Sequence, residues 1–312
     1  MTPARPTVLL YGKLMAGEKA AWEEGYLVVS VEGDELPPPD LAPTIEVIAS
    51  GDTVPNSLID ALPALRLVAC FSTGYTGIDL ADLRARDVTL TTAAGVNAHD
   101  VADHALALLL SLWHGVPEAD RRVREGEWRG SLVPRRSLRQ RRAGVVGLGR
   151  IGHEIAERLS ALGMEVRWWG PHAKPDAAFE RAASLLELAD WSDVLVVASR
   201  AAPENRHQID APVLAALGPD GVLVNISRGF LVDEDALIAA LEKGTVGGAA
   251  LDVFEQEPVS PDRWVEVPRI VVTPHIAGFT REAGVDMRRQ QRENVRRHFA
   301  GEPPLTPVHD TL

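Results

Sequence analysis

Three glycines near the middle of the chain constrain its fold more than any other feature. Gly147, Gly149 and Gly152 follow the apolar stretch from Ala143 to Val146, and apolar side chains at four-residue spacing come after them. A strand that leads through a G-x-G-x-x-G turn into a helix is the dinucleotide-binding fingerprint of parallel α/β sheets. The first glycine permits the turn, the second lets the backbone approach a pyrophosphate, and the third lets the helix pack closely. The predicted cofactor-binding residues of this turn are Gly147, Gly149, Arg150 and Ile151.

Apolar runs along the rest of the chain indicate the fold class. Stretches rich in Val, Leu and Ile occur at Thr7–Tyr11, Ile45–Ala49, Leu67–Phe71 and Val88–Thr91, and segments of helical period separate them. This alternation is typical of parallel strands joined by crossover helices. With 312 residues the chain is long enough for two compact domains. We therefore predict an α/β fold of two doubly wound parallel-sheet domains.

The composition argues against several classes of partner. The chain has 32 basic and 44 acidic side chains, a formal net charge of −12, which repels a polyphosphate backbone, so we expect no nucleic-acid partner. No apolar run approaches the roughly 20 residues that span a bilayer, and the first residues lack an apolar signal core. The single cysteine, Cys70, cannot form an intramolecular disulfide. We therefore expect no membrane partner and a cytoplasmic location.

The pattern changes twice in the middle of the chain. A long helix is expected from Asn97, with the Asn97 side chain as its N-cap and apolar residues along one face. A new series of strands and helices begins near Ala143. The stretch from Arg121 to Arg142 between them holds nine arginines. We interpret most of these arginines as a solvated helix face and loop.

The end of the strand predicted at Glu165–Trp169 bears on the choice of cofactor. In NAD-specific proteins an acidic residue at this point binds the ribose 2′-hydroxyl. Here the position holds Gly170, which would not repel a 2′-phosphate. The basic side chains of His172, Lys174 and Arg200 are placed where they could contact this phosphate. The sequence therefore favours NADP over NAD, and Gly170 and these three residues join the predicted cofactor site.

Three later strands each lead into polar side chains. The segments that follow them are Ser227-Arg228-Gly229, Asp252 to Pro258 and Pro274 to Gly278. Because open α/β sheets build their sites at the carboxyl ends of strands, we expect Arg228, Glu257 and His275 to meet at one rim. The guanidinium there can bind a substrate carboxylate. The side-chain carboxylate can adjust the pKa of the imidazole, and the imidazole can carry a proton.

Together these motifs resemble the D-isomer-specific 2-hydroxyacid dehydrogenases, a family that includes glyoxylate and hydroxypyruvate reductases and phosphoglycerate dehydrogenases. The resemblance runs from about Cys70 to about Gly278. The segments that carry it, besides the glycine turn and the three strand ends, are Gly74-Tyr75-Thr76-Gly77-Ile78-Asp79, Val101-Ala102-Asp103-His104 and Gly126-Glu127-Trp128. The resemblance implies an NAD(P)-dependent enzyme that transfers a hydride between the cofactor and a small 2-oxo or 2-hydroxy acid, with glyoxylate and hydroxypyruvate as the favoured substrates.

The resemblance also implies roles for individual residues. In the reducing direction, Arg228 binds the carboxylate and carbonyl oxygens of the substrate, and His275, tuned by Glu257, gives the carbonyl oxygen its proton. The residues matching the family's substrate loop are Ser72, Thr73 and Gly74, and those matching further cofactor positions are Ser227 and Asp252. Two departures from the family pattern are the missing acid at Gly170 and Arg200, where members commonly have proline.

The family's architecture implies a division of the chain. A Rossmann cofactor domain at residues 98–278 would be inserted into a flavodoxin-like substrate domain made of residues 1–97 and 279–312. The C-terminal helix would return to the first domain. Family members form dimers through their cofactor domains, so a homodimer is expected.

Other functions are weighed against this prediction. A nicotinamide-sensing corepressor would bind the dinucleotide without turnover, and retention of the catalytic trio argues against it. A phosphonate-oxidising dehydrogenase would carry lysine just before the substrate-loop glycine, where this chain has Thr73. The nine histidines include no close metal-ligand spacing such as H-E-x-x-H, so no metal is expected. His99 and His104, five residues apart on one helix, are interpreted as packing or interface residues.

Overall fold

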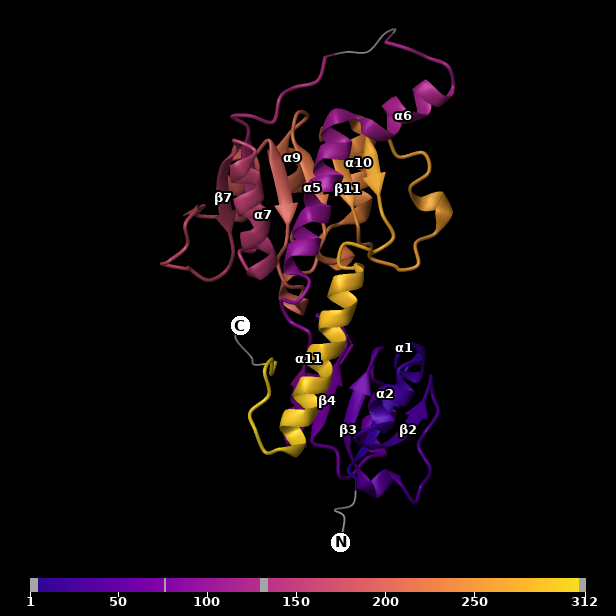
Figure 1. Ribbon diagram of the computed structural model, residues 1–312. Helices are drawn as coiled ribbons and strands as arrows, with labels where there is room; N and C mark the ends of the chain where they lie inside the picture. The colour runs from indigo at the N-terminus through magenta and orange to yellow at the C-terminus, as the bar shows by residue number, and fades with distance from the viewer. Residues whose placement is uncertain (1–4, 76, 130–133, 309–312) are drawn as a thin grey trace. The chain divides into compact units, whose positions relative to one another are not determined.

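The computed structural model describes residues 5–75, 77–129 and 134–308. The chain divides into two compact units, which Figure 1 shows by residue colour. The first unit comprises Met1–Asn97 and Thr280–Leu312, and the second comprises Ala98–Phe279. The second boundary therefore lies one residue after the position expected from the sequence.

The first unit is built on a five-stranded sheet. Its strands are β1 (Thr7–Tyr11), β2 (Leu27–Val31), β3 (Ile45–Ser50), β4 (Leu67–Cys70) and β5 (Thr89–Thr91). All neighbours are parallel, in the order β2-β1-β3-β4-β5, which is the flavodoxin-like order. Strand β2 was not among the predicted strands. It lies at the sheet edge and buries only some of its side chains, so its signal in the sequence is weaker.

Helices cover both faces of this sheet. They are α1 (Lys13–Ala16), α2 (Lys19–Glu23), α3 (Asn56–Asp60), α4 (Leu80–Ala85) and α11 (Arg281–Phe299). Successive side chains of a strand point to opposite faces, so Leu9 packs with α3 and α4 while Leu10 packs with α1, α2 and α11. The buried amide of Gln291 on α11 donates to the carbonyls of Ser50 and Ala69, at 3.0 and 2.8 Å. These bonds fasten the C-terminal helix to the first unit.

The second unit is built on a seven-stranded sheet. Its strands are β6 (Arg142–Val146), β7 (Glu165–Trp169), β8 (Glu180–Arg181), β9 (Val194–Val197), β10 (Val222–Asn225), β11 (Gly248–Leu251) and β12 (Ile270–Val272). All are parallel, in the order β12-β11-β10-β9-β6-β7-β8. The order reverses between β6 and β9, as in dinucleotide-binding sheets, where the ligand crevice lies at the carboxyl ends of the strands next to the reversal.

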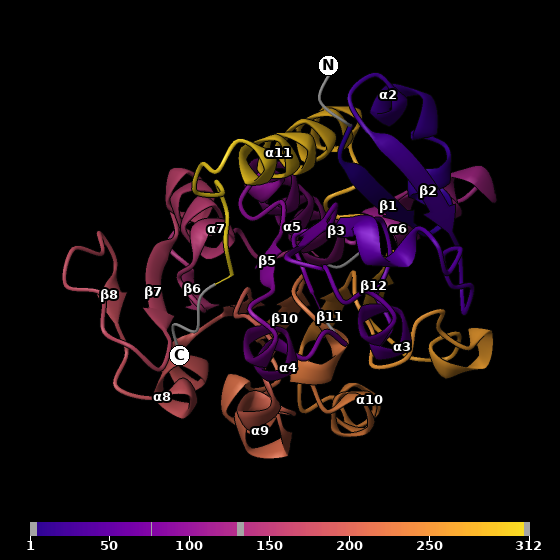
Figure 2. The ribbon, with the colours of Figure 1, turned by 90° about the horizontal axis from the view of Figure 1, so that it is seen from below.

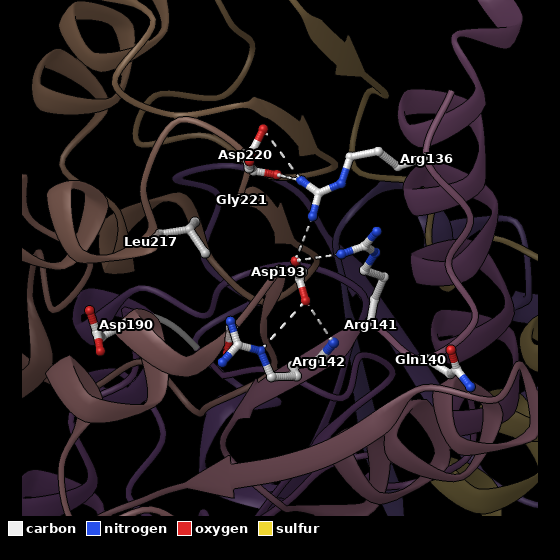
Figure 3. A pocket seen from close by; sticks show the side chains of 10 residues that line it. Arg136, Gln140, Arg141, Arg142, Asp190, Asp193, Leu217, Asp220 and Gly221 are labelled. Carbon is white, nitrogen blue, oxygen red and sulfur yellow. Dashed lines mark hydrogen bonds and ion pairs between the residues drawn. The ribbon is translucent and has the colours of Figure 1, made fainter. Parts of the chain in front are cut away.

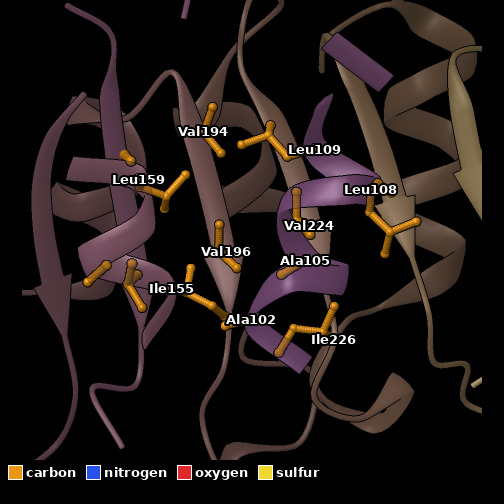
Figure 4. Packing of buried hydrophobic residues seen from close by; sticks show 14 of the residues in the cluster. Ala102, Ala105, Leu108, Leu109, Ile155, Leu159, Val194, Val196, Val224 and Ile226 are labelled. Atoms are coloured by element: carbon orange, nitrogen blue, oxygen red, sulfur yellow. The ribbon is translucent and has the colours of Figure 1, made fainter. Parts of the chain in front are cut away.

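Two apolar layers enclose this sheet. Its helices are α5 (Ala98–His114), α6 (Val116–Arg124), α7 (Arg150–Ala161), α8 (Leu185–Trp191), α9 (Ala211–Leu217) and α10 (Glu234–Lys243). Val194 and Val196 of β9 pack with α5 and α7 (Figure 4), whereas Leu195 and Val197 pack with α8, α9 and α10. Figure 2 shows these two sets of helices on opposite sides of the strands. Each such buried side chain contributes about 1.5–3 kcal/mol, so both layers hold the sheet firmly.

The start of α5 departs from the prediction. The helix begins at Ala98, directly after Asn97, but the Asn97 Oδ1 atom is buried and makes no hydrogen bond within the described residues. The predicted capping bond is therefore wrong. Propensity favours asparagine before a helix, but the bond also requires the side chain to turn back toward the first amides, and the buried rotamer of Asn97 does not.

The arginine-rich stretch has two structural roles. On α6, where no residue is buried, Arg121 pairs with Glu118 and Glu125, which confirms a solvated helix face. Before β6, three arginines instead gather around one carboxylate, Asp193, in the pocket of Figure 3. The Nη2 atom of Arg136 lies 3.0 Å from Asp193 Oδ1, and the backbone N–H of Arg142 donates to Asp193 Oδ2 at 2.9 Å. This pocket lies at the amino ends of β6 and β9, the edge opposite to the candidate site.

The cysteine, the apolar character of the helices and the grouping of metal-binding side chains bear on the remaining predictions. Cys70 is a free, buried cysteine, and burial raises the pKa of its thiol to about 12. Among the helices of the described ranges, none combines the length and the apolar character needed to cross a membrane. Within the same ranges, no group of three or more His, Cys, Asp or Glu residues is arranged to hold a metal ion.

Candidate active site

The glycine turn between β6 and α7 has the shape that a dinucleotide requires. Gly147 has φ +91°, and a Cβ there would come 2.5 Å from the Cα of Ser199. A Cβ at Gly152 would come 1.9 Å from the Gly147 carbonyl oxygen, so neither position accepts a side chain. A Cβ at Gly149 would meet nothing within 4 Å. The turn is thus closed on the protein side and open at Gly149, where a pyrophosphate would approach.

The N-terminus of α7 supports the same interpretation. No side chain caps the helix, and its first turn contains no acidic residue. Its first amide hydrogens and the positive end of its dipole therefore remain available to a phosphate. The residues of this chain fit a bound dinucleotide.

The end of β7 lacks an acid, as the sequence indicates. Gly170 is buried, and its carbonyl oxygen accepts hydrogen bonds from the side chain of Arg181. Lys174 reaches the glycine turn, where its Nζ donates to the carbonyl of Leu148 at 2.5 Å. His172 is exposed in the same loop. Two of the predicted cations, His172 and Lys174, therefore lie in one loop that contacts the glycine turn.

The third predicted basic residue of the phosphate site, Arg200, lies on another loop. It is exposed after β9, and its carbonyl accepts a hydrogen bond from the Asn205 amide at 2.8 Å. It directly follows Ser199, the residue that a side chain at Gly147 would strike, so its loop adjoins the glycine turn.

His275 and Glu257 form a hydrogen-bonded pair. The Nδ1 atom of His275 lies 2.6 Å from Glu257 Oε2, and the other carboxylate oxygen accepts from the Phe254 N–H at 2.9 Å. Glu257 is thus fixed by the backbone of its own loop, and it fixes the imidazole in turn. The His275 side chain is 45% exposed, which leaves Nε2 to face a ligand. This is the geometry of a general acid held by a carboxylate.

Asp252 organises the backbone around His275. It has no exposed surface, and its carboxylate accepts from the Ile276 and Ala277 N–H groups at 2.9 and 2.8 Å. Its carbonyl accepts from the His275 N–H at 2.8 Å. His275 has φ +53°, a conformation that costs a non-glycine residue energy and needs such support. The buried carboxylate of Asp252 therefore positions the His275 turn.

His104 joins this network, which the sequence analysis missed. Its Nε2 lies 3.0 Å from Thr273 Oγ1, and that hydroxyl donates to Asp252 Oδ1 at 2.6 Å. Helix α5 is thereby linked to the turn that carries His275. His104, interpreted as a packing or interface residue, is partly buried and hydrogen-bonded within its own unit, whereas the exposed His99 pairs with Glu154 at 2.9 Å. The contact between β12 and α5 depends on the order of the strands in the sheet, so it could not be predicted from the sequence.

Arg228 follows β10 and is held by its neighbours. The Asn225 side chain donates to the Arg228 carbonyl at 3.0 Å, and the guanidinium Nη1 donates to the Ser227 carbonyl at 2.6 Å. A Cβ at Gly229 would come 1.8 Å from the Phe254 backbone, so this loop packs on the Glu257 loop. Burial lowers the pKa of the Arg228 guanidinium, and the attraction of Glu257 opposes that effect. A partly desolvated guanidinium binds a carboxylate more strongly than an exposed one.

Ser227 ties the arginine loop to the glycine turn. Its hydroxyl donates to the Ser199 carbonyl, and Ser199 is the residue that a side chain at Gly147 would strike. The predicted cofactor residue Ser227 therefore lies on the same edge of the sheet as the dinucleotide turn. The structure brings together at this edge the elements that carry Arg228, Glu257 and His275.

The predicted substrate loop belongs to the first unit, after β4. The Ser72 hydroxyl donates to the Gly74 carbonyl at 2.6 Å, and the Ser72 carbonyl accepts from the Ala93 N–H at 2.9 Å. Thr73 and Gly74 are partly exposed. Such a loop, pinned at its start, can present backbone amides to a carboxylate.

Comparison with known proteins identifies a common family. The model of the D-isomer specific 2-hydroxyacid dehydrogenase NAD-binding domain matches residues 106–277. Hydroxyphenylpyruvate reductase from Plectranthus scutellarioides is 41% identical over 252 residues, which cover 80% of both chains. The 2-ketogluconate reductase of Gluconobacter oxydans is 37% identical over 86% of this chain and 88% of its own.

Solved structures agree with these relatives. The NADPH-dependent glyoxylate/hydroxypyruvate reductase from Sinorhizobium meliloti, in complex with NADP and malonate, has a TM-score of 0.91 and 35% identity, covering 99% of this chain and 98% of its own. The 2-hydroxyacid dehydrogenase from Ketogulonicigenium vulgare has a TM-score of 0.88 and 36% identity, covering 98% and 99%. The match extends over both units of the chain.

Proposed function

Since the chain belongs to the D-isomer specific 2-hydroxyacid dehydrogenases and is an NAD(P)-dependent oxidoreductase, we propose that it reduces a small 2-oxo acid by means of Arg228, Glu257 and His275. The observation that carries this proposal is the 2.6 Å contact between His275 Nδ1 and Glu257 Oε2, at the sheet edge that also holds the glycine turn. Relatives are named for glyoxylate, hydroxypyruvate and 2-ketogluconate, and small acids of this kind are the proposed substrates.

The cofactor is held by residues at the reversal of strand order. Gly147, Gly149 and the first amides of α7 bind the pyrophosphate, and Ser227 borders the same edge. When bound, the nicotinamide supplies the hydride. NADP is the preferred form, because Gly170 offers no acid to a ribose hydroxyl and Lys174 supplies a cation beside the glycine turn.

The chain's own residues bind the substrate and move the proton. The Arg228 guanidinium binds the carboxylate and the carbonyl oxygen of the 2-oxo acid, which orients the carbonyl carbon. The family resemblance implies that backbone amides near Thr73 and Gly74 also bind the substrate. Negative charge develops on the carbonyl oxygen during reduction, and His275 Nε2, as imidazolium, donates a proton to it. Glu257 holds Nδ1 and thereby orients the imidazole for this transfer.

The test is a matrix of cofactors and acids. NADPH and NADH are each combined with glyoxylate, hydroxypyruvate, 2-ketogluconate and hydroxyphenylpyruvate, and kcat/KM is measured from the loss of reduced nicotinamide absorbance. We expect turnover with at least one small acid, and a higher kcat/KM with NADPH than with NADH. Binding of cofactor without turnover of any acid would contradict the proposal. That outcome would favour the regulator that senses the dinucleotide. The similar proteins, which are named as reductases or dehydrogenases, do not favour that function.

Assembly and location form a second part of the proposal. We propose a homodimer that forms through the second unit, as family resemblance implies, and a cytoplasmic location, which the single cysteine suits. Sedimentation analysis of the purified chain tests the first statement. A single species with the mass of one chain, 33.7 kDa, at micromolar concentration would contradict the dimer.

A further inference from the structure

Two cations beside the end of β7 are bonded to backbone carbonyls and to no acid. Arg181 donates to the Gly170 carbonyl from Nε at 3.3 Å and from Nη2 at 2.7 Å. Lys174 donates to the Leu148 carbonyl. Neither side chain forms an ion pair with any residue in the described ranges, whereas nearby Arg167 pairs with Glu180 at 3.1 Å. The positive charge of both groups therefore remains available to an anionic ligand.

The sheet fixes the position of the Arg181 guanidinium. In the β7–β8 register, Arg181 lies opposite Trp168, two residues before Gly170. Its guanidinium carbon lies 5.8 Å from the centre of the Trp168 ring, and the side chain runs along β7 to the strand's carboxyl end. Trp168 is buried, and its indole N–H donates to the Phe179 carbonyl at 3.0 Å. A rigid aromatic platform and a backbone acceptor thus hold the guanidinium where β7 ends.

Gly170 is part of the same arrangement. A Cβ at this position would come 3.3 Å from the Trp168 ring, so a larger residue would press on the platform that carries Arg181. In dinucleotide-binding sheets the adenosine ribose lies at the end of the second strand, where an acid selects the 2′-hydroxyl and an arginine accommodates a 2′-phosphate. Here the acid is replaced by glycine, and the arginine comes from the neighbouring strand.

We propose that Arg181, with Lys174 beside it, binds the 2′-phosphate of NADP and is a specificity-determining residue for this cofactor. The inference rests on the proposed function and adds a residue from β8 to the predicted phosphate site. Nε and Nη2 share the Gly170 carbonyl, so the Nη1 hydrogens can donate to the phosphate. The fixed fork of an arginine suits phosphate oxygens, and Lys174 adds a second charge from the loop.

The test measures nucleotide binding without turnover. Titration calorimetry of the full chain compares 2′,5′-ADP, which carries the 2′-phosphate, with 5′-AMP, which lacks it. The wild type should bind 2′,5′-ADP more tightly. The affinity of the Arg181→Ala variant for 2′,5′-ADP should fall about tenfold or more, because the variant loses a charged hydrogen bond to the 2′-phosphate. Its affinity for 5′-AMP should stay the same, because 5′-AMP has no 2′-phosphate.

Matched variants make the result specific. Arg167→Ala removes an arginine from the adjacent strand that is already paired with Glu180, and it should leave both affinities unchanged. Lys174→Ala should show a loss of the same kind as Arg181→Ala. If Arg181→Ala unfolds, Arg181→Lys keeps a charge without the fork and should bind 2′,5′-ADP at an intermediate affinity.

Several outcomes would overturn the inference. They are equal wild-type affinities for the two nucleotides, an unchanged 2′,5′-ADP affinity in the arginine variants, or an equal loss for both nucleotides. The proposed function is tested separately. If Arg181 does not bind the 2′-phosphate, the chain should still reduce a 2-oxo acid with NADH. Conversely, selective binding of 2′,5′-ADP without turnover of any acid would support Arg181 and contradict the proposed reductase.

Discussion

Glu257 orients His275 and places a carboxylate against its Nδ1 atom. The imidazole has one bonded nitrogen, Nδ1, and the carboxylate that holds it is anchored by the Phe254 N–H. Replacing Glu257 with Gln keeps the size of the side chain but removes the negative charge. The imidazole then loses its charged partner at Nδ1, so proton donation from Nε2 should be slower.

We therefore expect Glu257→Gln to lower kcat for reduction throughout the pH profile, by roughly tenfold or more. Profiles of wild type and variant, measured with one acid and saturating NADPH, give the comparison. Glu255→Gln is a suitable control, because Glu255 lies on the same loop as Glu257 but pairs with Arg206 and His207 of the loop after β9. Within the described residues, no contact joins Glu255 to His275. Coincident profiles for wild type and Glu257→Gln would show that the pair does not govern proton transfer.

Arg228 is expected to act through the shape of its side chain as well as its charge. An ammonium cannot reproduce the two-pronged contact of a guanidinium with a carboxylate and a carbonyl oxygen. We expect Arg228→Lys to raise KM for the 2-oxo acid about tenfold or more, corresponding to the loss of one charged hydrogen bond. The KM for NADPH should stay near the wild-type value. A variant with normal KM for the acid would exclude the clamp.

At the scale of elements, α5 supports the turn that carries His275. The hydroxyl of Thr273 connects His104 of that helix to the buried carboxylate of Asp252, which in turn holds the backbone of residues 275–277. The left-handed conformation of His275 depends on this support. His104 and Thr273 are thus positioning residues, because they act on the reaction through Asp252 and the His275 turn.

The Thr273→Val variant tests this support. It preserves the volume of the side chain but removes the hydroxyl, so we expect kcat to fall about tenfold. KM for NADPH should change little, and Thr273→Ser should restore kcat, which a purely structural role for the side chain would not predict. Thr245→Val removes a hydroxyl bonded to the Ala240 carbonyl, away from the turn, and serves as control. Equal kcat values in wild type and Thr273→Val would contradict the positioning role.

The elements also show what a sequence can predict. Buried strands such as β6 and β11 are visible as apolar runs, and Gly147 and Gly152 are informative because their positions leave no room for a side chain. The two-residue strand β8 has no apolar run, so both it and the approach of Arg181 to Gly170 were missed. The hydrogen bonds between Asp252 and the loop after β12 were missed for a similar reason. They join two segments that become neighbours only through the order of the strands in the sheet.

At the scale of the whole molecule, each unit has its own sheet and its own apolar layers. Ligand binding to the second unit should therefore stabilise that unit through mass action alone. At 100 times the Kd, NADPH adds about 2.7 kcal/mol to the free energy of unfolding. For a unit of this size the gain corresponds to roughly 5–10 °C in Tm.

The Gly149→Asp variant separates folding from binding. A side chain at this position meets open space and ordinary backbone angles, so Tm without ligand should stay near the wild-type value. The added carboxylate would repel the pyrophosphate, so the increase in Tm with NADPH should disappear. Calorimetric scans with and without NADPH measure both effects. An undiminished shift in the variant would place the pyrophosphate elsewhere.

The central claim is that His275 donates the proton during reduction of a 2-oxo acid. The most direct test is single-turnover reduction by the His275→Ala variant with NADPH already bound, with His114→Ala, at the exposed end of α5, as control. For His275→Ala we expect a rate constant lower by roughly 10²- to 10⁴-fold than that of the wild type, and an unchanged Kd for NADPH. A rate constant equal to that of the wild type would contradict the central claim.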